Sequence, residues 1–124
     1  MLVTSKELFK IAKRHKFAIP AVNFMDQYTL RTYISVAEKL KLPIIVSFAQ
    51  AHHEEMDLEE AALLGRYYAK KAKTPVVLHL DHGEDMRFIK SAVDFGFSSV
   101  MIDASLDNME ENIRKTNEVI SYAH

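Results

Sequence analysis

The chain of 124 residues contains no cysteine, which excludes both disulfide bonds and zinc sites built from thiolates. Any metal would have to be held by histidine, aspartate or glutamate. Glycine and proline are scarce, with three of each, and no low-complexity segment or Ser/Gly/Pro-rich linker divides the chain. We therefore expect a single domain over residues 1–124, without an internal boundary.

The chain also has no excess of charge of either sign and no long apolar run. Sixteen basic residues face seventeen acidic ones, so the composition gives no reason to expect nucleic acid or a membrane surface as a partner. No stretch has the length of a membrane span, and the N-terminal residues lack the apolar core of a signal peptide. The default expectation is a cytoplasmic protein. A hydrophobic content of 48% is enough for a folded core.

Apolar runs alternate with helical patterns along the whole chain. A capping box at Thr4 to Glu7 predicts a short helix ending near residue 15. Four strand–helix pairs follow, with strands predicted at residues 17–24, 42–49, 75–83 and 98–103 and helices starting near residues 26, 57, 85 and 107. This alternation predicts an α/β fold with a parallel sheet. Two architectures fit it, an open flavodoxin-like sheet and half of a (β/α)8 barrel, which needs about 250 residues.

The third predicted strand, residues 75–83, carries the densest chemistry, because it ends with His79, Asp81 and His82. Side chains alternate along a strand, so His79 and Asp81 point to the same face. Burying an imidazole and a carboxylate together is costly unless both are satisfied. The pattern therefore indicates either a satisfied polar pair or a ligand site at the carboxyl edge of the sheet, and the residues alone leave both readings open.

Polar residues also end the other three predicted strands. In chain order the strand ends are Asn23, residues 47–50, Asp81 with His82, and Asp103 with Ser105. Parallel strands place all of these on one edge, which indicates a site. His82 and the carboxylates suit a hard or borderline divalent cation, and a nearby metal would keep Asp81 ionised and able to transfer protons. Three groups are too few for a complete zinc site.

A second cluster of polar residues, His52-His53-Glu54-Glu55, follows the second predicted strand. Its spacing differs from the His-Glu-x-x-His zinc signature. We interpret the cluster as a solvated loop that leads to a helix cap at Asp57, with a substrate-facing loop as the alternative.

Four segments together resemble the class II, metal-dependent fructose-bisphosphate and tagatose-bisphosphate aldolases. They are HLDHG at 79–83, SSVMID at 98–103, IPAVN at 19–23 and LPIIV at 42–46, in the family's order and spacing. The resemblance covers the full chain. It implies a TIM (β/α)8 barrel, of which residues 1–124 are the N-terminal half: the first four βα units, preceded by a short N-terminal helix and ending before strand five.

The resemblance also implies a function. It predicts a zinc-dependent aldolase that reversibly cleaves a ketose 1,6-bisphosphate (fructose or tagatose) to dihydroxyacetone phosphate and glyceraldehyde 3-phosphate. By position, Asp81 resembles the catalytic proton donor and acceptor, and His82 one of the zinc ligands. Asp103 resembles a carboxylate at a second cation position, and Asn23 a residue lining the pocket for the sugar phosphate. A Lewis-acidic zinc ion removes the need for a Schiff-base lysine.

The chain departs from the family in two respects. Residues 48–52 lack the serine and glycine that usually follow strand two, which keeps open a catalytically incompetent paralogue that acts as an α/β binding or assembly domain. The chain also ends where strand five would begin. Half a barrel leaves unpaired strand edges, so we expect either a missing C-terminal half-barrel or a homo-oligomer, and no turnover by the isolated chain.

Overall fold

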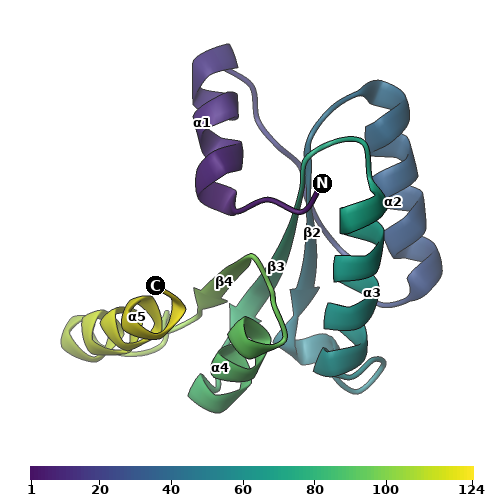
Figure 1. Cartoon of the computed structure of the whole chain (residues 1–124). Coiled ribbons are helices and arrows are strands. Elements are labelled where there is room, and N and C mark those ends of the chain that lie inside the picture. Colours follow the sequence, from purple (N-terminus) through teal and green to yellow (C-terminus); the bar gives the residue numbers. More distant parts are fainter.

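The computed structural model describes all residues 1–124, and its sheet decides between the two architectures (Figure 1). Four parallel strands lie in the order β1 (Ala21–Asn23), β2 (Ile44–Ala49), β3 (Val76–Gly83) and β4 (Ser99–Ile102). A doubly wound sheet reverses its strand order at a switch point. Here every strand pairs with its neighbour in sequence. The chain therefore has the strand order of a (β/α)8 barrel that is open after four strands, and the flavodoxin-like alternative is excluded.

A helix follows each strand, and one precedes the sheet. The helices are α1 (Ser5–His15), α2 (Gln27–Leu40), α3 (Leu58–Lys71), α4 (Met86–Asp94) and α5 (Met109–Ala123), with a 3-10 turn, η1 (Gln50–His52), after β2. Thr4 and Glu7 form the predicted capping box, and Asp26, Asp57, Asp85 and Asn108 accept hydrogen bonds from first-turn amides of the four later helices. The predicted helix starts are thus confirmed.

The first strand is shorter than predicted. The expected strand at 17–24 is reduced to Ala21–Asn23, because Phe17 takes part in the hydrogen bonds that close the C-terminal end of α1. Its amide donates to the carbonyl of Ala12, and Lys16 before it has a left-handed φ of 53°. Pro20 has no amide to offer a neighbouring strand; its carbonyl accepts from the amide of Ile45, and the paired positions of β1 and β2 begin with Ala21.

The two faces of the sheet pack against different helices. Buried side chains on one face, among them Val46, Phe48 and Leu78, join the large core beneath α2, α3 and α4. On the opposite face, Ile45 and Val77 pack against Leu8 of α1, and all three are buried. In a barrel this second face is the interior. Helix α1 therefore covers the interior near the amino-terminal end of the strands, far from the edge where they finish (Figure 1).

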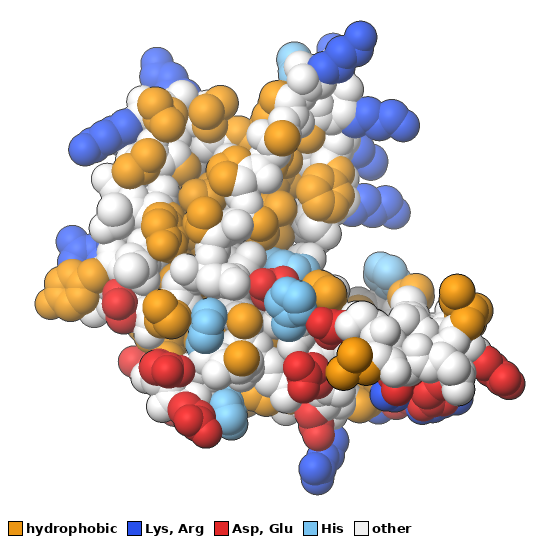
Figure 2. Space-filling view, turned by 180° about the vertical axis from the view of Figure 1, so that it is seen from behind, with side chains coloured by type: hydrophobic (Ala, Val, Ile, Leu, Met, Phe, Trp, Pro, Cys, Tyr) orange, Lys and Arg blue, Asp and Glu red, His pale blue; other side chains and the backbone are white.

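The rest of the interior face is open. Figure 2 shows this side, with apolar side chains over its centre and acidic and histidine side chains in its lower part. The Lys and Arg side chains stand mostly around its periphery. All four residues of β4 are only half-buried, because no strand pairs with its outer edge. None of the helices combines the length and the apolar character that a membrane span requires.

Candidate functional site

Asp81 and Asn23 meet at the carboxyl edge of the sheet. The register pairs Asn23 with Ser47, Ser47 with His79, and Ala49 with Asp81, so these side chains all lie on the interior face. The side-chain amide of Asn23 donates to Asp81 Oδ2 at 3.1 Å. Two residues that lie 58 positions apart are thus brought together by the order of the strands, and the amide fixes one oxygen of the carboxylate.

His82 reaches the same place through a local irregularity of the backbone. The pairing of β3 with β4 is interrupted between Leu80 and Gly83, and His82 has a left-handed φ of 46°. In a regular strand His82 would point away from Asp81. Here its Nε2 lies 3.9 Å from Asp81 Oδ1. A non-glycine residue in this region costs about 1–3 kcal/mol, and such strain concentrates at functional sites.

The other nitrogen of His82 is held by Asp103, which follows β4. His82 Nδ1 donates to Asp103 Oδ2 at 2.7 Å, and Asp103 Oδ1 accepts from the amide of Ser105 at 3.1 Å. The hydrogen bond to Asp103, and next the charge of Asp81, raise the pKa of His82. The same hydrogen bond, supported by Ser105, lowers the pKa of Asp103 to about 2. Asp103 is therefore ionised and orients the His82 ring.

The His82–Asp103 pair fits one part of a metal site. An imidazole that ligates a metal usually donates its other N–H to a carboxylate, and His82 Nε2 makes no hydrogen bond within the chain. Within residues 1–124, however, no three His, Asp or Glu side chains are arranged to hold a metal ion. The residues present thus suit a single ligand and its support, and further ligands would have to come from outside residues 1–124.

His79 lies beneath Asp81 on the interior face of β3. Its Nδ1 lies 2.9 Å from the hydroxyl oxygen of Ser99 on β4, and its Nε2 is 4.0 Å from Asp81 Oδ1. Only 20% of the His79 side chain is exposed, and burial lowers the pKa of the ring. The alternation of β3 predicts that His79 and Asp81 share a face, whereas the contact with Ser99 has no signal in the sequence.

Gln50, one of the polar residues that the sequence places at the end of the second strand, makes contacts that the sequence did not reveal. Its side-chain oxygen accepts hydrogen bonds from the amides of Glu84 at 2.8 Å and Asp85 at 3.1 Å. Gln50 therefore fastens the turn after β2 to the turn after β3. No local pattern could have indicated this contact, because its partners lie 34 and 35 residues along the chain.

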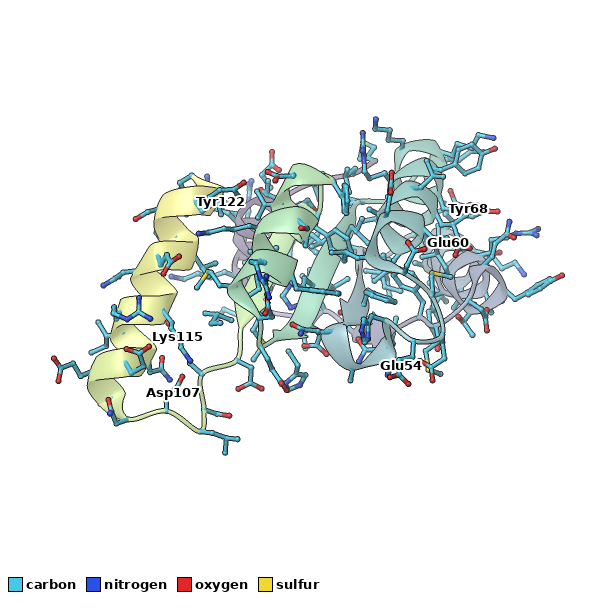
Figure 3. The ribbon with its side chains drawn as sticks, turned by 90° about the horizontal axis from the view of Figure 1, so that it is seen from below. Glu54, Glu60, Tyr68, Asp107, Lys115 and Tyr122 are labelled. Atoms are coloured by element: carbon cyan, nitrogen blue, oxygen red, sulfur yellow. The ribbon has the colours of Figure 1, made fainter.

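The segment 52–55 is only partly the solvated loop that its composition predicts. Glu54 and Glu55 are exposed, and Figure 3 shows Glu54 in the turn after η1. Both histidines also pack edge-on against aromatic rings, His52 on Phe48 and His53 on Phe88. His53 nevertheless stays exposed, as the interpretation predicts, whereas His52 is half-buried with its Nδ1 shielded from solvent, so the interpretation was wrong for His52 alone.

Acidic groups dominate the edge where the strands end. Figure 3 views the molecule from this end and shows Asp107, in the loop before α5, beside Lys115 of the helix. Lys115 Nζ donates to Asp107 Oδ2 at 2.6 Å, so this carboxylate is neutralised within the chain. Asp81 instead has only the Asn23 amide and the two imidazoles near it. It is thus available for chemistry.

Comparison with known proteins gives one consistent result. The family described as fructose-bisphosphate aldolase class-II matches residues 3–124. A fructose-bisphosphate aldolase of Giardia intestinalis is 36% identical over 99% of the chain and 38% of its own length. A 6-phospho-5-dehydro-2-deoxy-D-gluconate aldolase of Bacillus subtilis is 38% identical over 98% of the chain and 43% of its own length.

The fold leads to the same proteins. The crystal structure of the YdjI aldolase from Escherichia coli superposes with a TM-score of 0.93 and 34% identity, over 98% of this chain and 47% of that chain. A fructose-bisphosphate aldolase from Campylobacter jejuni superposes with a TM-score of 0.85 and 25% identity. Residues 1–124 thus span less than half the length of the proteins that they match.

Proposed function

The chain belongs to the class II fructose-bisphosphate aldolase family, and from this premise we propose that residues 1–124 are the N-terminal half of a barrel that cleaves a phosphorylated ketose. The favoured substrate is fructose or tagatose 1,6-bisphosphate, with dihydroxyacetone phosphate and glyceraldehyde 3-phosphate as products. The names of two relatives cover two different phosphorylated substrates, so the substrate has to be determined by assay.

One observation carries the proposal: Asp81 is ordered at the carboxyl edge, beside an imidazole with a free Nε2. Asn23 holds Asp81 Oδ2, which leaves Oδ1 to face His82 Nε2 at 3.9 Å. In cleavage, Asp81 accepts the proton of the hydroxyl next to the carbon–carbon bond that breaks. In condensation it returns that proton to the aldehyde oxygen. The Asn23 amide keeps the carboxylate in place and lines the pocket.

A divalent metal, zinc in our proposal, supplies a Lewis acid for the negative charge left on the ketone half of the substrate. His82 Nε2 is the ligand that this chain offers. Asp103 holds the His82 ring through Nδ1. The carboxylate of Asp103 has further lone pairs that could bind a cation at the proposed second position. Residues 1–124 bring no three His, Asp or Glu side chains together, so the proposed site needs further ligands from outside them.

Completion of the barrel is the second part of the proposal. The outer edges of β1 and β4 have no partner strand. A hollow of about 360 Å³ lies beside β4, between the start of α1 and the end of α5, where a further strand would pack. We propose that a C-terminal half-barrel, or a second copy in a homo-oligomer, pairs with these edges. Sedimentation of residues 1–124 as a stable, well-folded monomer would argue against this.

The decisive experiment separates metal binding from proton transfer in the completed barrel, that is, residues 1–124 together with the half-barrel that closes them. His82→Ala should lower zinc content, whereas Asp81→Asn should abolish cleavage of the bisphosphate with zinc still bound. Asp94→Asn is a matched control, because Asp94 contacts Tyr122 on the helical side, far from the site. If neither His82→Ala nor Asp81→Asn changes metal content or turnover, the alternative of a binding or assembly domain is favoured.

The isolated chain offers a simpler test. Residues 1–124 alone should not cleave fructose or tagatose 1,6-bisphosphate, and should not cleave the gluconate phosphate in the name of the Bacillus relative. The reason is that one histidine cannot hold a catalytic zinc ion. Turnover by the 124-residue monomer would contradict the proposal.

A further inference from the structure

His79 is a buried imidazole that the proposed reaction does not use. It points into the barrel interior one pleat below Asp81, and both of its nitrogens face polar atoms. Nδ1 lies 2.9 Å from Ser99 Oγ, and Nε2 lies 4.0 Å from Asp81 Oδ1. The His79 ring thus links Ser99 of β4 to the carboxylate of Asp81, which indicates a role besides packing.

The chemistry of these contacts selects one tautomer of His79. A carboxylate can only accept hydrogen bonds, so the nitrogen that faces Asp81 is favoured as N–H. In a neutral ring the other nitrogen then carries a lone pair, and the Ser99 hydroxyl, 2.9 Å away, can donate its proton to Nδ1. Burial, which lowers the pKa of His79, supports the neutral ring. A Ser99 hydroxyl that donates to Nδ1 places the ring proton on Nε2, where it faces Asp81.

We propose that His79 is a positioning residue for Asp81, which it holds from below through Nε2–H while Asn23 holds the other oxygen. This inference rests on the proposed function of Asp81 in proton transfer. The 4.0 Å distance is longer than a hydrogen bond, and catalytic contacts often shorten only when the substrate is bound. With the His79 contact shortened, donors from β1 and β3 leave the carboxylate little freedom to rotate, so that it is preorganised for the substrate hydroxyl.

The first test measures the tautomer of His79 in the completed, metal-free barrel by the ¹⁵N chemical shifts of its ring. We expect a neutral ring with the proton on Nε2. Ser99→Ala should shift the population towards the Nδ1–H tautomer, and Ser99→Thr should restore it. Ser98→Ala is the matched control, because the Ser98 hydroxyl contacts the backbone of Leu78 and should leave His79 unchanged.

Three results of this test would overturn the proposal. They are an Nδ1–H tautomer in the unmodified chain, a ring protonated on both nitrogens at neutral pH, and equal shifts in the Ser98 and Ser99 variants. The test needs no activity and no metal. Its failure is therefore distinguishable from failure of the proposed function, which would appear as unchanged turnover in Asp81→Asn.

The second test uses the completed barrel and the rate of bisphosphate cleavage. His79→Leu removes the donor and should lower kcat by about ten-fold to a hundred-fold with little change in KM, the scale expected when a reacting group is misplaced. His79→Gln places an amide donor near the position of Nε2 and should recover part of the loss. If the Leu and Gln variants lose kcat equally, or lose it through KM, His79 has only a structural role.

Discussion

His82 Nδ1 lies 2.7 Å from Asp103 Oδ2, and this contact ties the end of β3 to the loop that follows β4. Since His82 donates through Nδ1, its Nε2 is directed to the mouth of the sheet, 3.9 Å from Asp81. The carboxylate of Asp103 therefore determines which nitrogen of His82 the end of β3 presents to Asp81. The ring cannot swing away without breaking a charge-assisted hydrogen bond.

The first prediction concerns Asp103 and metal affinity. Asp103→Ala should weaken zinc binding in the completed barrel by about ten-fold to a hundred-fold, because it removes the acceptor that orients the His82 ring. Competition with a chelator measures the affinity. Asp94→Ala removes a carboxylate of α4 that contacts only Tyr122 and should leave the affinity unchanged. Equal affinities for the Asp103→Ala and unmodified proteins would contradict this role.

The second prediction concerns the backbone of His82, whose φ is 46°. A side chain in this left-handed region costs about 1 kcal/mol relative to glycine. His82→Gly should therefore unfold in urea with a free energy about 1 kcal/mol higher than His82→Ala, although both variants lose the imidazole. A less stable glycine variant would show that the left-handed conformation is not maintained in solution.

The third prediction concerns the contact of α3 with β3. A Cβ added to Gly65 would lie 2.5 Å from Cδ1 of Leu78, whose side chain is fully buried. Gly65→Ala should destabilise the chain by about 1–3 kcal/mol in urea unfolding, since the core has no space for the methyl group. In a Leu78→Ala background the same change should become neutral or stabilising, because alanine favours helix over glycine. An unchanged effect would rule out this steric cause.

The fourth prediction concerns pH and the cap of α2. The hydrogen bond from the Thr29 amide lowers the pKa of Asp26 in the folded chain. A lowered pKa gives a stability contribution that is present above the unfolded value, near 3.9, and is lost as the pH falls through the folded value. The stability gap between the unmodified chain and Asp26→Asn should thus shrink from pH 7 to pH 3. Urea midpoints measure it, and a constant gap would contradict the assignment.

Much of the fold could be predicted because its signals are local. Thr4, Asp26, Asp57 and Asp85 mark helix starts within three residues of the amides that they cap, and the alternation of β3 places His79 with Asp81. The strand order could not be read from these patterns. It followed from the family resemblance, and the structure agrees with it.

The finer geometry of the site depends on interactions that leave no local trace. The left-handed turn at His82 lies within a strand-like sequence, where only Gly83 hints at an irregularity. The contacts of Ser99 with His79 and of Gln50 with Glu84 join strands or turns 20 and 34 residues apart. Their partners could be named only once the register of the sheet was known.

The Gln50 side chain also limits how this protein could be redesigned. Grafting the segment after β2 from a relative is an obvious way to alter substrate preference, but Gln50 binds the amides of Glu84 and Asp85 in the next segment. A graft without an equivalent acceptor would leave two N–H groups unpaired and loosen the start of α4. The two segments therefore form one exchangeable unit, and chimeras should carry both.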